Sequence, residues 1–173
     1  MTFGAFCLDR AGALQQRGDV MTESTPQDLI SADRWAIAES EAPPRKGIIR
    51  FRTPVLSPHQ VKGYPTCLRV LWAYASEGSG TLPDEPTSLQ LQAFENRLVD
   101  AFEQDAVAVL TAVLTFDGAR RWVFYTADIV ACGTRIECMP QESEPYPIEI
   151  DMFNDPEWRY LRDEVLATVP RGA

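Results

Sequence analysis

Hydrophobic and polar residues are arranged along the chain in patterns that predict six strands and several helices between residues 25 and 170. Strands are expected where apolar residues alternate with polar ones or form short unbroken runs, at 34–39, 48–53, 66–74, 107–116, 120–126 and 146–152. Helices are expected at 87–104 and 155–168, with a short helical turn at 25–30. Residues 128–138 fit a short helix interrupted by Gly133, with four residues facing inward: Ile129, Val130, Ile136 and Met139.

The two long helices begin at residues that suit a helix N-terminus. Thr87 and Gln90 predict a capping box at the first helix, whose apolar stripe leaves Glu95 and Glu103 on other faces.

The last helix is expected to begin at Asp155, whose side chain can accept hydrogen bonds from the first helical N–H groups. Pro156 suits the first helical position, and Glu157 favours the positive end of the helix dipole. Trp158 then opens an apolar stripe, so we expect its side chain in the core.

The order of these elements predicts an α+β fold. After the first two strands come strand, helix, strand, strand, weak helix and strand, which is the split β-α-β order of ferredoxin-like folds. In that topology the strand at 107–116 would lie at a sheet edge, where an apolar strand invites aggregation. We therefore expect a hairpin of 34–39 and 48–53 to pair alongside it, in a mostly antiparallel sheet with helices on one face. Asp117-Gly118 predicts a two-residue hairpin turn directly after the apolar strand.

One domain is expected over residues 25–170, preceded by a poorly ordered extension at 1–24. Residues 1–20 show no periodicity and lack the continuous apolar core of a signal peptide. Met21 is a second candidate for the start of translation, so the sequence leaves both Met1 and Met21 open as starts.

The charge balance is acidic. Sixteen Lys and Arg against 25 Asp and Glu give a net charge of -9, in a 173-residue chain that is 45% hydrophobic and can therefore form a core. Binding to nucleic acid requires clustered Lys and Arg, so the charge disfavours direct nucleic-acid binding and equally an anionic membrane surface. An acidic protein can present carboxylates to a basic partner protein. The alternative is a charge that only maintains solubility.

Four cysteines and one histidine restrict the chemistry. Cys132 and Cys138 lie six residues apart and no C-x-x-C pair exists, so we expect no metal and no cofactor. His59 and Cys67 form a nucleophile–base pair in principle, but no third orienting residue is evident. No apolar run is long enough to cross a membrane, and we expect a reducing cytoplasmic location with free thiols.

Several motifs together resemble a known family. They are Tyr64-Pro65 and Tyr146-Pro147 before two strands, the strand Arg120-Arg121-Trp122-Val123-Phe124-Tyr125, and Asp155-Pro156-Glu157-Trp158-Arg159-Tyr160. From about residue 33 to 168 the chain thereby resembles the bacterial domain of unknown function 695 family. The resemblance implies an intracellular bacterial protein and carries no assigned activity. The layout is also distantly similar to that of the B-type protein regulators of ribonuclease E, which are small, acidic and ferredoxin-like.

The candidate binding patch consists of Arg120, Arg121, Tyr125, Asp155, Glu157 and Tyr160. Its arginines and aromatic rings could hold an anionic ligand by charge and stacking. The structural alternative is a hairpin whose arginines face water, together with a capped helix. Arg50 and Arg52 are expected on a solvated strand face.

Two functions follow from these observations. The first is a non-enzymatic protein-interaction or regulatory module, because the chain is acidic and lacks both a phosphate loop and a nucleophile–base motif. The second is a small-ligand-binding protein or enzyme that uses the Arg/Trp/Tyr/Asp cluster. A deep pocket holding Arg121, Tyr125 and Asp155 together would favour the second function.

Overall fold

The computed structural model describes residues 24–40, 47–75, 82–140, 142 and 144–169. Within these ranges the protein is an α+β structure with one six-stranded antiparallel sheet, which confirms the expected class and strand direction. The expected extension at 1–24, including Met21, lies outside the described residues except for Ser24.

The elements follow in the order α1 (Pro26–Ala32), β1 (Trp35–Ser40), β2 (Gly47–Arg52), β3 (Thr66–Ala73), α2 (Glu85–Glu103), β4 (Ala108–Phe116), β5 (Ala119–Thr126), α3 (Ile129–Cys138) and β6 (Ile148–Asn154). A π-helical segment, η1 (Tyr160–Val165), and a 3₁₀ turn, η2 (Leu166–Thr168), follow. We call η1 and η2 together the C-terminal helix. None of the helices in the described residues is long and apolar enough to cross a membrane.

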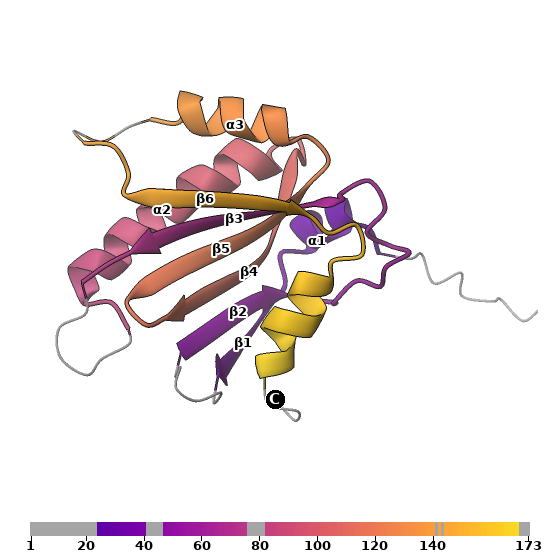
Figure 1. The fold of residues 1–173 in the computed structure, drawn as a ribbon, viewed down its shortest axis with the longest axis horizontal. Helices are drawn as coiled ribbons and strands as arrows, with labels where there is room; N and C mark the ends of the chain where they lie inside the picture. The colour runs from indigo at the N-terminus through magenta and orange to yellow at the C-terminus, as the bar shows by residue number, and fades with distance from the viewer. Residues whose placement is uncertain (1–23, 41–46, 76–81, 141, 143, 170–173) are drawn as a thin grey trace, which may run out of the picture.

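The strand order in the sheet is β1-β2-β4-β5-β3-β6 (Figure 1). β1 pairs with β2, and β2 pairs with β4, so the apolar β4 lies inside the sheet with a partner on each side. β1 and β6 form the two outer edges. The position of β4 explains its sequence, since a strand buried on both faces is almost wholly apolar.

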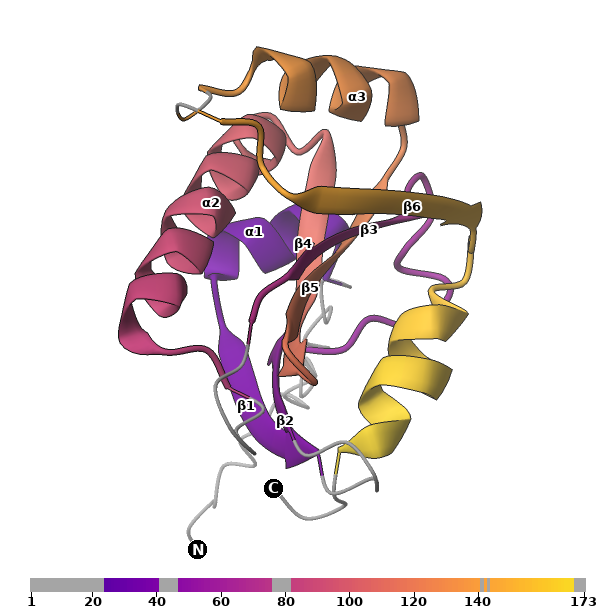
Figure 2. The ribbon, with the colours of Figure 1, turned by 60° about the vertical axis from the view of Figure 1, so that its left-hand side comes forward.

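Helices cover both faces of the sheet, so the expectation of helices on one face is wrong (Figure 2). On one face, which we call the α2 face, α2 and α3 pack over a core that includes Phe94 and Trp122. On the other face, the C-terminal helix, α1 and the β2–β3 loop cover a second core that includes Val61, Tyr125 and Trp158. The reason is that β4 and β5 carry apolar residues at successive positions, and both of their faces must be removed from water.

The turn at Asp117-Gly118 is confirmed. Both residues have left-handed backbone angles, with φ of 49° and 70°, as a type I′ turn requires.

α2 begins earlier than the sequence pattern indicates. Asp84 is its N-cap, since the Asp84 carboxylate accepts the Thr87 N–H at 2.9 Å, and Pro86 lies in the first turn. Hydrogen bonding to Thr87 lowers the pKa of Asp84 below its ordinary value. The expected capping box of Thr87 with Gln90 is therefore wrong, because Thr87 already lies inside the helix.

α3 confirms the short helix expected at 128–138, and Asp128 caps it by accepting the Ala131 N–H at 2.9 Å. Of the four residues expected to face inward, Ile129, Ile136 and Met139 do pack against the core of the α2 face, and only Val130 is wrong. Cys132 is buried, whereas Val130 is 76% exposed.

Candidate functional site

The residues of the candidate binding patch separate into groups with different environments. Tyr125 on β5 is fully buried, and its hydroxyl donates to the Asp155 carboxylate at 2.7 Å. Burial raises the pKa of Tyr125, so this hydroxyl stays protonated as the donor. The same carboxylate accepts the backbone N–H groups of Arg159 at 2.8 Å and Tyr160 at 2.9 Å. Asp155 is thus a buried linker between β5 and the C-terminal helix.

The C-terminal helix consequently begins later than expected. Asp155 to Trp158 form a turn, and the helical segment η1 starts only at Tyr160. The expected roles of Pro156 and Glu157 in the first helical turn are therefore wrong. Trp158 is nevertheless buried as expected, with 1% exposed, and its ring stacks on Tyr125 at a centroid distance of 4.3 Å.

Of the remaining patch residues, Arg121 and Tyr160 contact each other, whereas Arg120 and Glu157 lie apart from them. Arg121 lies on the same face as Tyr125, and its guanidinium donates to the Tyr160 hydroxyl at 3.4 Å. Arg120 points to the α2 face, where it donates to the Thr115 hydroxyl at 3.1 Å. Glu157 is exposed and pairs with Arg159. The structure therefore brings four of the six residues together and places Arg120 and Glu157 elsewhere.

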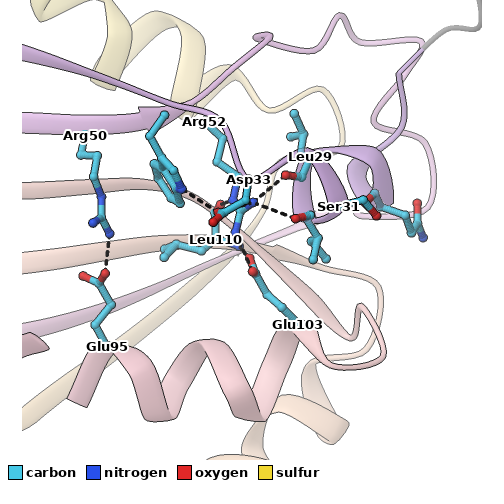
Figure 3. Close-up of polar contacts among 11 residues, drawn as sticks. Leu29, Ser31, Asp33, Arg50, Arg52, Glu95, Glu103 and Leu110 are labelled. Carbon is cyan, nitrogen blue, oxygen red and sulfur yellow. Dashed lines mark hydrogen bonds and ion pairs between the residues drawn. The ribbon is translucent and has the colours of Figure 1, made fainter. Parts of the chain in front are cut away.

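A second polar cluster, which sequence reasoning missed, lies between α2 and the sheet (Figure 3). Arg52 at the end of β2 is only 5% exposed, so the expectation that it lies on a solvated face is wrong. It forms a salt bridge with Glu103 of α2 at 2.6 Å and donates to the carbonyls of Leu110 at 2.8 Å and Leu29 at 2.5 Å. Arg52 therefore ties β2 to α1, α2 and β4.

Glu103 completes this link by accepting the Leu110 N–H at 2.8 Å. The β4–β5 pairing shifts register between Leu110 and Ala112, and β2 ends opposite this point. The side chains of Arg52 and Glu103 thus bind both backbone groups of Leu110 where the strand ladder of β2 stops. Burial raises the pKa of Glu103, while the charge of Arg52 acts in the opposite direction.

Glu95 occupies the equivalent position two turns earlier on α2. It pairs with Arg50, which is about one-third exposed, and accepts the Trp122 indole N–H at 2.8 Å. The guanidinium groups of Arg50 and Arg52 lie 4.5 and 4.7 Å from the ring centroid of Trp35. The expected separation of Glu95 and Glu103 from the buried face of α2 is therefore wrong.

A sequence signal for this cluster exists in α2. Glu95 directly follows Phe94, and Glu103 directly follows Phe102, so each carboxylate borders the apolar stripe. A carboxylate at the margin of a buried stripe needs a cationic partner from a facing element. Arg50 and Arg52, two residues apart on one strand face, match that requirement.

The cysteine chemistry is limited by burial. Burial raises the pKa of Cys67 to about 12 and also raises that of Cys132. His59 is exposed in the β2–β3 loop, whereas Cys67 has no exposed surface. These properties oppose a role for Cys67 as a thiolate nucleophile. Among the described residues, no group of three or more His, Cys, Asp and Glu side chains is arranged to hold a metal ion.

A groove of about 600 Å³ adjoins the start of β6. Trp72, Phe94 and Tyr146 line it with ring centroids 4.7–5.8 Å apart. Arg97 at its rim donates to the Tyr146 hydroxyl and pairs with Glu142 at 2.6 Å. Arg97 and Glu142 therefore bind each other, and Glu144 is a further carboxylate in the lining.

β6 differs from the other strands in its exposure. Four consecutive residues, Glu149 to Met152, are exposed, although β6 pairs with β3 along its whole length. Ile150 and Met152 lie on the α2 face with 43% and 53% exposed, while Glu149 and Asp151 lie on the opposite face. The β6 edge thus presents apolar groups on one side and carboxylates on the other.

A family model for the family of unknown function DUF695 matches residues 33–164, which is most of the chain. The chain belongs to the DUF695 family. In this DUF695 protein the match spans every strand of the described residues and the charged residues of both polar clusters, and it ends within the C-terminal helix. No curated protein and no solved structure matches the chain.

Proposed function

We propose that this DUF695 protein is a non-enzymatic interaction or regulatory module of the bacterial cytoplasm that presents an acidic surface to a basic partner protein. The observation that carries the proposal is the distribution of charge. Six arginines form salt bridges with carboxylates within the described ranges: Arg50, Arg52, Arg69, Arg97, Arg135 and Arg159. The chain has nine more acidic than basic residues. Because each of these arginines is paired with a carboxylate, the excess negative charge is carried by carboxylates outside these salt bridges.

Those carboxylates lie at the surface. Exposed acidic residues outside the salt bridges of the described ranges include Asp84, Glu85, Asp100, Asp128, Glu137, Glu144, Glu149, Asp163 and Glu164. Such a field attracts basic partners over distance and repels nucleic acid and anionic membranes. The proposal accordingly includes no direct contact with either.

The enzyme alternative is less well supported by the geometry. Tyr125 and Asp155 bind each other in the core, and Asp155 also accepts two backbone N–H groups. Polar groups that satisfy each other inside a core stabilise it and are not available to a substrate.

We also infer that the core of the fold is ferredoxin-like. β3, α2, β4, β5, α3 and β6 follow the split β-α-β order, and their strands lie in the order β6-β3-β5-β4. In this description the hairpin β1–β2 extends the core beside β4.

The test is affinity capture with the full chain, followed by binding kinetics with the purified partner over a salt series. The association rate should fall as salt rises, because charges further apart than about 10 Å are screened at 0.1 M ionic strength. A partner whose association rate is independent of salt would contradict the electrostatic mechanism. Reproducible turnover in a broad substrate screen, lost in Arg121→Met or Asp155→Asn, would favour the enzyme instead.

A further inference from the structure

The backbone of β6 has one hydrogen-bonding edge that faces away from the sheet. The Asp155 N–H donates to the Pro65 carbonyl at 2.7 Å, continuing the register of the β3–β6 pair. In an antiparallel pair, hydrogen-bonded residues alternate with non-hydrogen-bonded ones. Glu149, Asp151 and Phe153 therefore direct their backbone groups toward β3. Ile150 and Met152 direct theirs outward, and within the described residues no strand pairs with this edge.

The outward-facing residues are also the exposed apolar residues of β6. α3 lies beyond β6 in both views, yet it leaves Ile150 and Met152 about half exposed (Figures 1 and 2). An added strand would therefore find backbone partners and apolar side chains at the same two positions.

The carboxylates on one face of β6 indicate which side chains an added strand should carry. Arg69 pairs with Asp151, whereas Glu149 enters no salt bridge within the described ranges, and Glu144 just before the strand enters none either. In an antiparallel pair, directly opposed residues share a face. A segment that alternates apolar and basic residues would place apolar groups opposite Ile150 and Met152, and cations opposite Glu149 and Asp151.

A second copy of this chain fits the edge less well. Two antiparallel β6 strands would bring Glu149 and Asp151 of each copy onto one face of the shared ladder. Like charges opposite one another destabilise a strand pair. The carboxylates thus disfavour self-association and favour a basic partner.

We infer that a partner protein adds an extended segment of alternating apolar and basic residues, antiparallel, to the outer edge of β6. This inference rests on the proposed interaction function and names the surface and the partner chemistry. Strand addition gives affinity through main-chain hydrogen bonds and selectivity through alternate side chains.

The direct test uses the full chain and a labelled peptide of about nine alternating valine and lysine residues, enough to span the seven residues of β6. Binding is measured by fluorescence anisotropy. The valine/lysine peptide should bind, and the matching valine/glutamate peptide should bind at least about tenfold more weakly. Bound peptide should slow hydrogen exchange at the amides of Ile150 and Met152. Failure of the valine/lysine peptide to bind, or equal binding of both peptides, would overturn the inference.

Backbone methylation of the peptide provides a control that leaves the protein unchanged. Valines opposite Ile150 and Met152 would donate their N–H groups to β6, whereas lysine N–H groups would point away. N-methylation of the valines should therefore abolish binding, and N-methylation of the lysines should preserve it. Equal effects of the two modifications would contradict strand addition.

The opposite edge of the sheet provides a matched protein control. The Thr53 N–H donates to the Arg34 carbonyl, so by the same alternation Ile37 of β1 directs its N–H outward, and it is 67% exposed. Because proline is tolerated where a strand N–H faces solvent, Ile150→Pro should lose peptide binding and Ile37→Pro should retain it. Loss in Ile37→Pro alone would place the site on β1. A dimer that disappears in Ile150→Pro would show that β6 binds a second copy.

The failure of this inference can be distinguished from failure of the proposed function. If the partner isolated by affinity capture binds Ile150→Pro as tightly as the wild type, strand addition at β6 is wrong while the interaction function stands.

Discussion

Trp158 has a left-handed backbone conformation, with φ of 56°, which a bulky residue rarely adopts. Three contacts hold it there. Its ring stacks on Tyr125, its indole N–H donates to the Tyr64 carbonyl at 2.9 Å, and its backbone N–H donates to the Asp155 carbonyl. The backbone conformation therefore depends on residues from three separate segments of the chain.

Truncation of this side chain should be severely destabilising. Trp158→Ala should lower the free energy of unfolding by about 3–5 kcal/mol, because it removes a fully buried ring. The measurement is urea denaturation, with Arg159→Ala as the exposed neighbouring control. A Trp158→Ala variant that melts like the wild type would show that the ring contributes no core packing.

Burial also determines which thiols react. Cys138 is exposed, whereas Cys67 and Cys132 are buried and have raised pKa values. In a Cys7→Ser background, a thiol reagent at about pH 8 should modify Cys138 rapidly, because only an accessible thiolate attacks. Cys67 and Cys132 should react only as the protein unfolds. Rapid labelling that persists after Cys138→Ser would contradict this assignment.

At the scale of elements, the Arg52–Glu103 pair joins strands and helices whose contact cannot be predicted from the hydrophobic periodicity of each element. Burying a salt bridge has a high desolvation cost. We expect this pair to contribute to stability mainly through the backbone groups that it also binds. Here these groups are the N–H and carbonyl of Leu110 and the carbonyl of Leu29 near the end of α1.

Breaking this pair from one side should leave a buried charge. Arg52→Met should cost about 3–5 kcal/mol of unfolding free energy, measured by denaturant titration. The loss of unfolding free energy in Arg52→Met/Glu103→Met should be smaller than the sum of the losses in the two single variants by about 0.5–3 kcal/mol. The reason is that the double variant leaves neither charge buried without its partner. The double variant should still be less stable than the wild type, because Leu110 loses both partners.

The exposed Arg135–Asp105 pair is the control for this cycle. Arg135→Met should have a much smaller effect, because solvent screens a surface pair. Strictly additive effects at Arg52 and Glu103 would contradict the link between them.

At the scale of the whole molecule, the sheet has two covered faces, and its two outer strands each have one edge that no strand of the described residues pairs with. The faces are closed by α2 and α3 on one side and by the C-terminal helix with α1 on the other. The edges β1 and β6 are therefore the places where the sheet itself can meet another chain.

The stability of the domain should not depend on residues 1–20. Their sequence shows no core-facing pattern, and the DUF695 match begins at residue 33. A chain that starts at Met21 should melt within a few degrees of the full chain in a thermal unfolding experiment. A loss of more than about 2 kcal/mol, the scale of a serious core defect, would contradict this.

The sequence by itself determined the number and position of the strands, the hairpin turn at Asp117-Gly118 and the family. These features depend on local periodicity and on backbone preferences that neighbouring residues express directly. The burial of Trp158 was also predicted correctly, although this residue lies in the turn before the C-terminal helix rather than in the helical stripe that suggested it.

Only the tertiary structure decided which polar residues lie inside. Alternation shows that Arg50 and Arg52 share a face of β2, but it does not show that α2 covers that face with Glu95 and Glu103. Similarly, the sequence around Asp155 suits a helix start, yet the long-range hydrogen bond from Tyr125 helps hold it in a turn. Periodicity reports which side chains are neighbours along one element. Burial depends on what a distant segment brings against them, and that information is present only in the packed fold.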